Sequence, residues 1–462
     1  MNCLHEDRAV PESKMQEEVS YHFDTVRMHP CSSKQISMLE QIMDRRNIEK
    51  ALLQVEGNKG AGGVDGMQTD KLRNYLTTHY QQLRQEVLSG NYRPSPVRKV
   101  TIPKADGGER MLGIPTVIDR LLQQAISQWL SQFYEPDFSA FSFGFRPNKS
   151  AHHAVHQAQI FLNEGKLYVV ELDLEKFFDT VNHDKLMSLL MRKVTDKDTL
   201  KFIRQYLRSG IMEGGVVSQR TEGTPQGSPL SPLLSNIILD ELDKELTSRG
   251  HSFVRYADDC SIYVKSEKSA HRVLTGITTY LEDCLKLKVN KAKSKVSRPT
   301  ESTLLGFSFY NDKGKWAVRI AKKSIERIRA KSKKITGRSN GSNNGEKILK
   351  MKTLIQGWVN YFSIANAKTI MQQLDECVRT RLRMGLWKEW KRCKTRVFNL
   401  LKLKASKQKA YEWGNSSRGY CRVAHSPILC TTLNNAYFKS QGYEGFANTF
   451  KRVTEAKQLS LF

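Results

Sequence analysis

The chain has 462 residues, more than one compact core usually supports, so roughly two to four domains are expected. Lys and Arg number 74 against 47 Asp and Glu, and the formal net charge of +27 predicts a polyanionic partner. Residues 317–462 alone carry 31 basic and 8 acidic side chains. A basic surface kept for solubility would intersperse the two signs, so this segregation favours a nucleic-acid surface. Apolar residues at 39% exclude global disorder.

Eight cysteines are scattered without a C-x-x-C pair, which argues against a zinc ribbon and against a disulfide framework. Cys421, His425 and Cys430 lie close in sequence, but a closed zinc site needs four ligands. The cysteine pattern favours reduced thiols in a cytosol-like compartment. Without a signal peptide or an apolar run long enough to cross a bilayer, we expect a cytoplasmic protein that does not contact membranes.

The first predicted elements follow a polar segment, residues 1–37, expected to be a weakly structured extension. Apolar spacing predicts a helix over residues 37–55. The Gly-rich stretch 60–66 is interpreted as a tight turn, with close approach of the backbone to a ligand as the alternative; no Lys-Ser/Thr follows, which disfavours a P-loop. Residues 97–118 alternate and break at two glycines, which predicts a β-hairpin, with a helix over residues 119–133 after it.

Two of the later predicted elements place carboxylates at strand ends. Residues 167–174 are predicted to be a strand with Val169, Glu171 and Asp173 on one face. Residues 252–264 are typical of a hairpin whose tip carries Asp258 and Asp259. The other predicted elements are a turn-rich segment at 223–232, a helix at 233–246, a strand at 304–309 and basic helices at 320–335, 348–364 and 369–390.

Two adjacent carboxylates at a hairpin tip, Asp258 and Asp259, indicate a divalent cation. Like charges this close raise the pKa of one carboxyl unless a cation neutralises them. Hard oxygen ligands select Mg²⁺ over zinc or copper. Asp173, at the end of a different strand, is the candidate further ligand of a site for two ions. An Asp-Asp pair alone is more often ordinary turn chemistry, so the prediction depends on the combination.

The chain resembles reverse transcriptases in motifs that follow the family's order. Tyr256-Ala257-Asp258-Asp259 resembles the Y-x-D-D box, residues 173–179 resemble the first metal-binding motif, and residues 225–229 resemble the nucleotide-contacting segment. More narrowly, three segments are similar to bacterial group II intron reverse transcriptases (maturases): 102–120, Phe143-Gly144-Phe145-Arg146-Pro147, and Gly357-Trp358-Val359-Asn360-Tyr361-Phe362. The resemblance extends from about residue 38 to beyond residue 400.

This resemblance implies an α+β, right-hand polymerase fold. The implied parts are an N-terminal extension (1–37), an N-terminal helical element and fingers (38–166), an antiparallel palm with the catalytic carboxylates (167–316), a helical thumb or domain X (317–392), and a basic, helical, DNA-binding C-terminal arm (393–462). The paired Cys and His residues of an HNH endonuclease are not found before residue 462. Cleavage of target DNA by this chain is therefore not expected.

The resemblance also implies roles for single residues. Asp173, Asp258 and Asp259 would be the catalytic metal ligands, with the Leu174 carbonyl as a fourth. Lys104 and Arg110 would cover the triphosphate of the incoming nucleotide, and Lys293 would approach its phosphates. Phe178 would exclude a 2′-hydroxyl, and Gln226 and Gly227 would contact the nucleotide or the template base. The primer grip would be formed by Leu305, Gly306 and Phe307. There are three alternatives. Phe178 could be an ordinary core residue, Lys104 and Arg110 could be solvated charges in a turn, and Lys291 could take the place of Lys293. Ala292 departs from the acidic residue that the family often carries there.

A basic surface for nucleic acid is predicted past residue 317. Cations at spacings of three and four share a helix face that could follow a duplex backbone, with a merely solvated face as the alternative. The predicted nucleic-acid-binding residues are Lys322, Lys323, Arg327, Lys331, Lys334, Trp387, Lys388, Lys391 and Arg392.

Together these features predict an RNA-directed DNA polymerase that uses two Mg²⁺ ions, which Mn²⁺ could replace, and dNTPs. The resemblance implies intron RNA, RNA template, DNA primer and DNA target as partners, with roles in splicing and in target-primed retromobility. One alternative is a domesticated reverse transcriptase that acts in phage defence, diversification or DNA repair. A second is a non-catalytic RNA-folding cofactor, which the intact Asp173, Asp258 and Asp259 disfavour.

Overall fold

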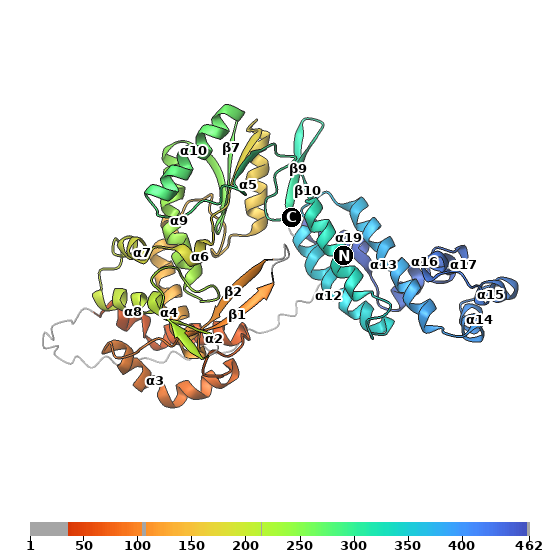
Figure 1. Cartoon of the computed structure of the whole chain (residues 1–462), viewed down its shortest axis with the longest axis horizontal. Helices are drawn as coiled ribbons and strands as arrows, with labels where there is room; N and C mark the ends of the chain where they lie inside the picture. The colour runs from red at the N-terminus through yellow and green to blue at the C-terminus, as the bar shows by residue number, and fades with distance from the viewer. Residues whose placement is uncertain (1–35, 104–107, 214, 460–462) are drawn as a thin grey trace, which may run out of the picture. The chain divides into compact units, whose positions relative to one another are not determined.

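The computed structural model describes residues 36–103, 108–213 and 215–459, and Figure 1 shows the arrangement of their helices and strands. The expected extension, residues 1–37, lies almost entirely outside the described residues, as does Lys104. The described residues from Met38 onward belong to one compact unit. Within the described ranges, no helix combines the length and the apolar character needed to cross a membrane.

The N-terminal part combines helices with a small sheet. The single helix predicted over 37–55 is two helices, α1 (Met38–Ile42) and α2 (Arg45–Gly57), because Asp44 is extended and its side chain caps α2 by accepting from the Arg46 amide. The predicted hairpin at 97–118 is formed by β1 (Val97–Pro103) and β2 (Glu109–Ile114). These strands continue into a four-stranded sheet of order β2-β1-β4-β5, with β4 (Ile211–Glu213) and β5 (Val216–Ser218).

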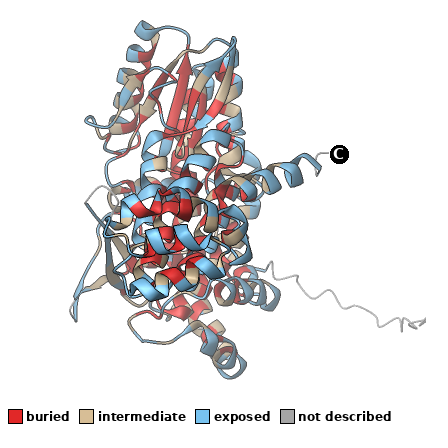
Figure 2. Ribbon diagram, turned by 90° about the vertical axis from the view of Figure 1, so that its right-hand side faces the viewer, coloured by how far each residue is buried: buried red, intermediate tan, exposed pale blue. Residues whose placement is uncertain are grey.

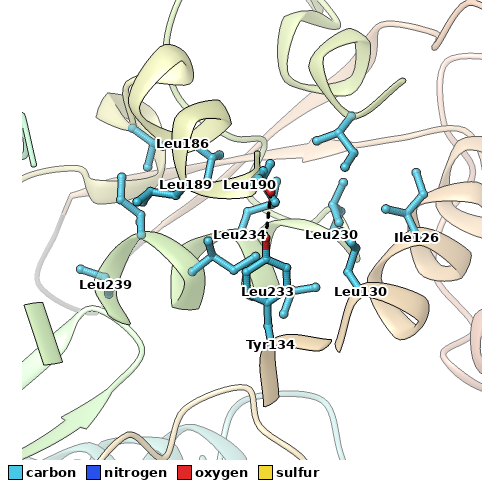
Figure 3. Packing of buried hydrophobic residues seen from close by; sticks show 14 of the residues in the cluster. Ile126, Leu130, Tyr134, Leu186, Leu189, Leu190, Leu230, Leu233, Leu234 and Leu239 are labelled. Atoms are coloured by element: carbon cyan, nitrogen blue, oxygen red, sulfur yellow. Dashed lines mark hydrogen bonds between the residues drawn. The ribbon is translucent and has the colours of Figure 1, made fainter. Parts of the chain in front are cut away.

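Three helices pack into an apolar core that supports the rest of this part. Leucines and isoleucines of α4 (Val117–Tyr134), α7 (His183–Leu190) and α9 (Ser231–Ser248) face one another in Figure 3. The Tyr134 hydroxyl donates to the Leu190 carbonyl oxygen at 3.3 Å, so the one polar group on this tyrosine is satisfied inside the core.

The central sheet is antiparallel, with strand order β6-β7-β3-β8. Its strands are β6 (Ser252–Tyr256), β7 (Asp259–Val264), β3 (Tyr168–Leu172) and β8 (Lys295–Ser297). Val170 and Ile262 pack in the core with α9 and α10 (Glu267–Asp283), whereas Val169 and Tyr263 pack in a second core with α5 (Ala151–Asn163). Figure 2 shows these strands as largely buried. The alternation predicted for residues 167–174 is thus observed.

A second hairpin and a series of helices follow the sheet. β9 (Phe307–Asp312) pairs with β10 (Lys315–Ile320), and β9 begins later than the predicted strand at 304–309 because Leu305 and Gly306 adopt left-handed φ angles of 52° and 83°. The following helices are α11 (Lys322–Ile335), α12 (Asn344–Phe362), α13 (Lys368–Glu389), α14 (Cys393–Lys402), α15 (Lys407–Gly414), α16 (Tyr420–Ala424), α17 (Pro427–Thr432), α18 (Asn435–Ser440) and α19 (Gly445–Leu459). The remaining elements are α3 (Leu72–Leu88), α6 (Phe177–Thr180), α8 (Lys197–Arg208) and the 3₁₀ helices η1 (Thr69–Lys71) and η2 (Glu135–Asp137).

The expected boundary between residues 392 and 393 falls inside one continuous core. α19 packs on α12 and α13, and Phe446 of α19 is fully buried among residues of both. Asp375 of α13 accepts hydrogen bonds from the Phe446 amide at 2.6 Å and from the Tyr443 hydroxyl at 2.9 Å. Residues 393–459 are therefore joined to the preceding helices by buried contacts.

Candidate active site

The structure brings Asp173, Asp258 and Asp259 together at neighbouring strand ends. β3 and β7 are antiparallel with Leu172 opposite Cys260, so Asp173 and Asp259 are the next residues to face each other. Asp258 lies in the turn between β6 and β7. Desolvation, followed by the charges of Asp258 and Asp173, raises the pKa of Asp259 to about 6. Desolvation also raises the pKa of Asp258, and nearby Arg110 opposes that shift.

The carboxylate oxygens at these strand ends are the hard ligands that divalent ions prefer. Within the described ranges, no three His, Cys, Asp or Glu side chains form a ready-made metal cage, and this holds also for Cys421, His425 and Cys430. Mg²⁺ is usually bound by one or two carboxylates, water and substrate phosphates, so an all-protein cage is not required. Leu174 is opposite Val289 in a non-hydrogen-bonded antiparallel pair, which turns its carbonyl away from residue 289. That carbonyl can therefore serve as a ligand.

Asp173 is held in place by the segment that carries Lys293. The Ser294 hydroxyl accepts from the Asp173 amide at 3.0 Å, and the Asn290 amide donates to the Asp173 carbonyl oxygen at 2.8 Å. Lys293 Nζ lies 3.8 Å from Asp173 Oδ2, whereas Lys291 makes no such ion pair. Sequence reasoning missed Ser294, because one serine after a lysine-rich run carries no recognisable signal.

Adjacent phenylalanines on α6 face different surroundings. Phe177 is 3% exposed and belongs to the core, while Phe178 is half-buried and packs against it with ring centroids 5.2 Å apart. The Phe178 carbonyl oxygen accepts from the Thr224 amide at 2.6 Å. The turn-rich segment that follows Thr224 is thereby fixed beside Phe178.

The turn-rich segment also docks onto the β1–β2 hairpin. The Gly113 amide donates to the Gln226 carbonyl oxygen at 2.8 Å. Gly227 has a φ of 109°, and a Cβ there would lie 3.1 Å from the Gly113 carbonyl oxygen, so a side chain is disfavoured. The hairpin that carries Arg110 and the segment that carries Gln226 therefore form one assembly, and Gly113 is a contact that sequence reasoning missed.

The residues predicted to grip a primer are clamped by two helices. The Gly306 carbonyl oxygen accepts from the Ala321 amide and from the Ser324 hydroxyl of α11, both at 3.0 Å. The Tyr361 hydroxyl of α12 donates to the Leu305 carbonyl oxygen at 2.9 Å. Phe307 is fully buried. The Gly-Trp-Val-Asn-Tyr-Phe segment, whose tyrosine is Tyr361, thus contacts the predicted primer grip.

Comparison with known proteins assigns the family. Residues 102–309, which include all three aspartates, match the family model "Reverse transcriptase (RNA-dependent DNA polymerase)". Residues 325–403 match "Group II intron, maturase-specific domain". Protein YkfC of Escherichia coli (strain K12) is 35% identical over 280 residues, which are 52% of this chain and 73% of YkfC. The chain belongs to the reverse transcriptase family. This membership assigns it RNA-directed DNA polymerase activity, and its residues 325–403 match a maturase-specific domain.

Two further similarities cover smaller parts of the known proteins. The group II intron-encoded protein LtrA of Lactococcus lactis subsp. cremoris is 37% identical over 188 residues, which are 40% of this chain and 31% of LtrA. The reverse transcriptase thus matches less than a third of LtrA. A chain of a partial Cas6-RT-Cas1–Cas2 complex is 24% identical, with a TM-score of 0.33, over 54% of this chain and 43% of that chain. That structural likeness is weak.

The first basic helix of the reverse transcriptase has one buried side. Ser324, Ile328 and Ser332 of α11 are buried at a spacing of four residues, and the other sides are exposed. We define the α11 cation face as the five exposed residues Lys322, Lys323, Arg327, Lys331 and Lys334. The predicted amphipathic helix with an outward cation face is therefore present.

Trp387 does not belong to this surface, contrary to the prediction. Its side chain is 1% exposed, and the Arg396 guanidinium lies over its ring, 4.7 Å from the centroid. An enclosed indole cannot stack on a nucleic-acid base. Lys388 Nζ donates to the Arg338 carbonyl oxygen at 3.1 Å and to Ser339 at 3.0 Å, whereas Lys391 and Arg392 are exposed.

The raised pKa of Asp259 predicts a link between pH and metal ions. Its carboxyl must lose a proton to bind an ion, so ion affinity should fall about tenfold per pH unit as pH decreases below about 6. At limiting Mg²⁺, the acid limb of the primer-extension rate should have a midpoint near pH 6. Higher Mg²⁺ should move that midpoint to lower pH. Rates measured across pH at two Mg²⁺ concentrations test this, and a midpoint independent of Mg²⁺ would contradict it.

Proposed function

We propose that this chain copies RNA into DNA at the strand ends that carry Asp173, Asp258 and Asp259. The observation that supports this most strongly is the convergence of these aspartates inside the region that matches reverse transcriptases. In this proposal the central sheet is the palm of a right hand (167–316), residues 38–166 form the N-terminal element and fingers, and residues 317–392 form the thumb.

The metal ligands in this proposal are the three aspartates and the Leu174 carbonyl. When bound, two Mg²⁺ ions would activate the primer 3′-hydroxyl and stabilise the leaving pyrophosphate. Arg110, close enough to influence the pKa of Asp258, would bind the triphosphate together with Lys104. Lys293, whose Nζ lies 3.8 Å from Asp173 Oδ2, would approach the same phosphates.

The nucleotide pocket would be formed by residues that the structure holds in one assembly. The half-buried Phe178 ring would contact the sugar of the incoming nucleotide, and the buried Phe177 ring packs against it. Gln226 and Gly227 are fixed to the hairpin of Arg110 through Gly113 and would contact the nucleotide or the template base. Leu305 and Gly306, clamped by α11 and α12, would support the primer end.

We further propose intron RNA as a partner, with a DNA target as the primer source during mobility. The maturase match covers α12, α13, α14 and most of α11, and the α11 cation face supplies charge for a phosphate backbone. Exposed Lys391, Arg392 and the basic residues beyond them would contact DNA. The maturase match favours this role over phage defence, diversification or DNA repair. A role in phage defence, diversification or DNA repair predicts that RNA from the flanking intron binds this chain no better than unrelated RNA of equal length.

Extension of a DNA primer on an RNA template, with and without Mg²⁺, tests the polymerase. We expect extension only with the divalent ion and with dNTPs. Absence of extension with Mg²⁺ and with Mn²⁺ would contradict the proposal. A DNA-templated reaction run in parallel shows whether copying of RNA is specific.

The affinity for RNA should fall steeply with salt. Each phosphate contact made by a cation contributes about −0.7 to −0.9 to the slope of log affinity against log salt, so the α11 cation face alone predicts a slope of roughly −4. Joint replacement of Lys331 and Lys334 by glutamine should reduce its magnitude by about 2. Replacement of exposed Lys268 in α10 is the matched control and should leave the slope unchanged. A slope near zero in the unmodified chain would show that these cations face only solvent.

A further inference from the structure

A fully buried ion pair lies directly beneath the carboxylate turn. Arg255, two residues before Ala257-Asp258, is 0% exposed, and its Nε and Nη2 donate to Asp243 Oδ1 at 2.7 Å and Oδ2 at 2.6 Å. Asp243 lies on α9 and is also 0% exposed. Buried ion pairs are weak contributors to stability, because desolvation offsets most of their attraction. Stability alone therefore does not account for this pair.

The remaining guanidinium donors reach the turn itself. Arg255 Nη1 donates to the Ala257 carbonyl oxygen at 3.1 Å and to Asn236 Oδ1 at 3.0 Å. Ala257 has a φ of 58°, in the left-handed region that non-glycine residues rarely occupy. Such a conformation persists only where surrounding contacts enforce it. The bond from Arg255 to its carbonyl is one such contact.

The segment Phe143-Gly144 holds the turn from a second direction. The Phe143 amide donates to the Arg255 carbonyl oxygen at 2.9 Å, which adds a short parallel bridge beside β6. A Cβ at Gly144 would lie 2.2 Å from the Ala257 amide nitrogen, so only glycine fits. Asn236 Nδ2 donates to the Gly144 carbonyl oxygen at 2.9 Å and so joins this segment to Arg255. The Phe-Gly-Phe-Arg-Pro motif thereby gains a physical role.

We propose that Arg255, Asp243, Asn236 and Gly144 are positioning residues that hold Asp258 and Asp259 in the geometry that binds divalent ions. We name these four residues the turn clamp. The proposal rests on the proposed function, since the ions are those of the polymerase site. None of the four needs to touch substrate, because each acts through the backbone of the turn. Without the clamp, repulsion between the aspartates and the strain at Ala257 would both favour a relaxed turn.

The test measures ion binding directly as well as activity. Mn²⁺ binding is titrated by electron paramagnetic resonance of the free ion, on the full chain, for the unmodified protein and for Gly144→Ala. The matched control is Gly57→Ala, where a Cβ would have no neighbour within 4 Å. We expect Gly144→Ala to weaken Mn²⁺ binding at least tenfold and to raise the Mg²⁺ concentration for half-maximal extension similarly. The KM for the primer–template duplex should stay within about twofold, which a general loss of structure would not allow.

Asn236→Ala is the second variant, because it removes the link between Arg255 and Gly144 without adding bulk. Asn236→Ala should also weaken Mn²⁺ binding. If thermal unfolding shows that Gly144→Ala is not folded, the turn clamp is tested by Asn236→Ala alone. Mn²⁺ binding equal to that of Gly57→Ala in a folded Gly144→Ala, or in Asn236→Ala, would overturn the turn clamp. An unmodified chain that neither binds Mn²⁺ nor extends a primer would instead overturn the proposed function, so the two failures are distinguishable.

Discussion

Replacement of Asp258 by alanine should abolish primer extension on an RNA template. The variant removes a carboxylate from the group formed with Asp173 and Asp259, whose members influence one another's pKa. The metal ions of such a site contribute several kcal/mol to transition-state stabilisation, so the single-turnover rate should fall by roughly 10³-fold or more. RNA affinity should stay within about threefold, because the α11 cation face is unchanged.

The matched control for this prediction is Asp184→Ala. Asp184 is an aspartate on α7 whose side chain is 85% exposed and pairs with Arg204 at 2.7 Å, away from the carboxylate turn in sequence. Its loss should leave extension within about twofold, since exposed ion pairs contribute little. Extension that survives in Asp258→Ala would show that the ions, if bound, are held elsewhere.

Phe178→Ala should relax the choice between deoxyribose and ribose. The Phe178 ring is half-buried, whereas the ring of its neighbour Phe177 is enclosed in the core. Removing the ring would open space for a 2′-hydroxyl, and the kcat/KM ratio for UTP over dTTP should rise on the order of 10 to 100-fold. Incorporation opposite a single template adenine, measured with each nucleotide separately, gives this ratio.

The adjacent residue provides the contrast for this prediction. Phe177→Ala deletes a buried ring and should cost about 3–5 kcal/mol of unfolding free energy, with little change in sugar selectivity among folded molecules. Thermal unfolding and the same incorporation assay separate the two effects. An unchanged nucleotide ratio in Phe178→Ala would remove the sugar gate from the proposal.

Local sequence patterns were sufficient to predict the positions of the three aspartates, because each lies at a strand end or turn marked by its neighbouring residues. Alternation and turn residues suffice for the strands around Asp173 and Asp258, and their convergence follows once the strands pair. The turn clamp was not predictable, because Asn236 and Gly144 are 92 residues apart and the Phe-Gly-Phe-Arg-Pro motif around Gly144 does not indicate which residues it contacts. The one available signal was an arginine, Arg255, inside an apolar strand, which requires a buried partner.

Sequence patterns were ambiguous where the same residues suit a surface and a core. Trp387 lies among basic residues and so was predicted to bind nucleic acid, yet it is enclosed beneath Arg396. The resemblance implied a basic C-terminal arm at 393–462, but the hydrogen bond between the Phe446 amide and Asp375, far apart in the chain, joins α19 to α13. Composition reports charge and does not report which apolar side chains meet.

The hydrogen bonds to the Leu305 and Gly306 carbonyl oxygens join the proposed primer grip directly to α11 and α12. α11 holds Gly306 through Ser324, and α12 holds Leu305 through Tyr361. A duplex that displaces α11 would therefore also displace the backbone of the proposed primer grip, because the hydrogen bond between them is direct. In the proposed polymerase, weaker binding of the template–primer hybrid by α11 would then also misalign the primer 3′ end, so partial release of the hybrid would pause synthesis.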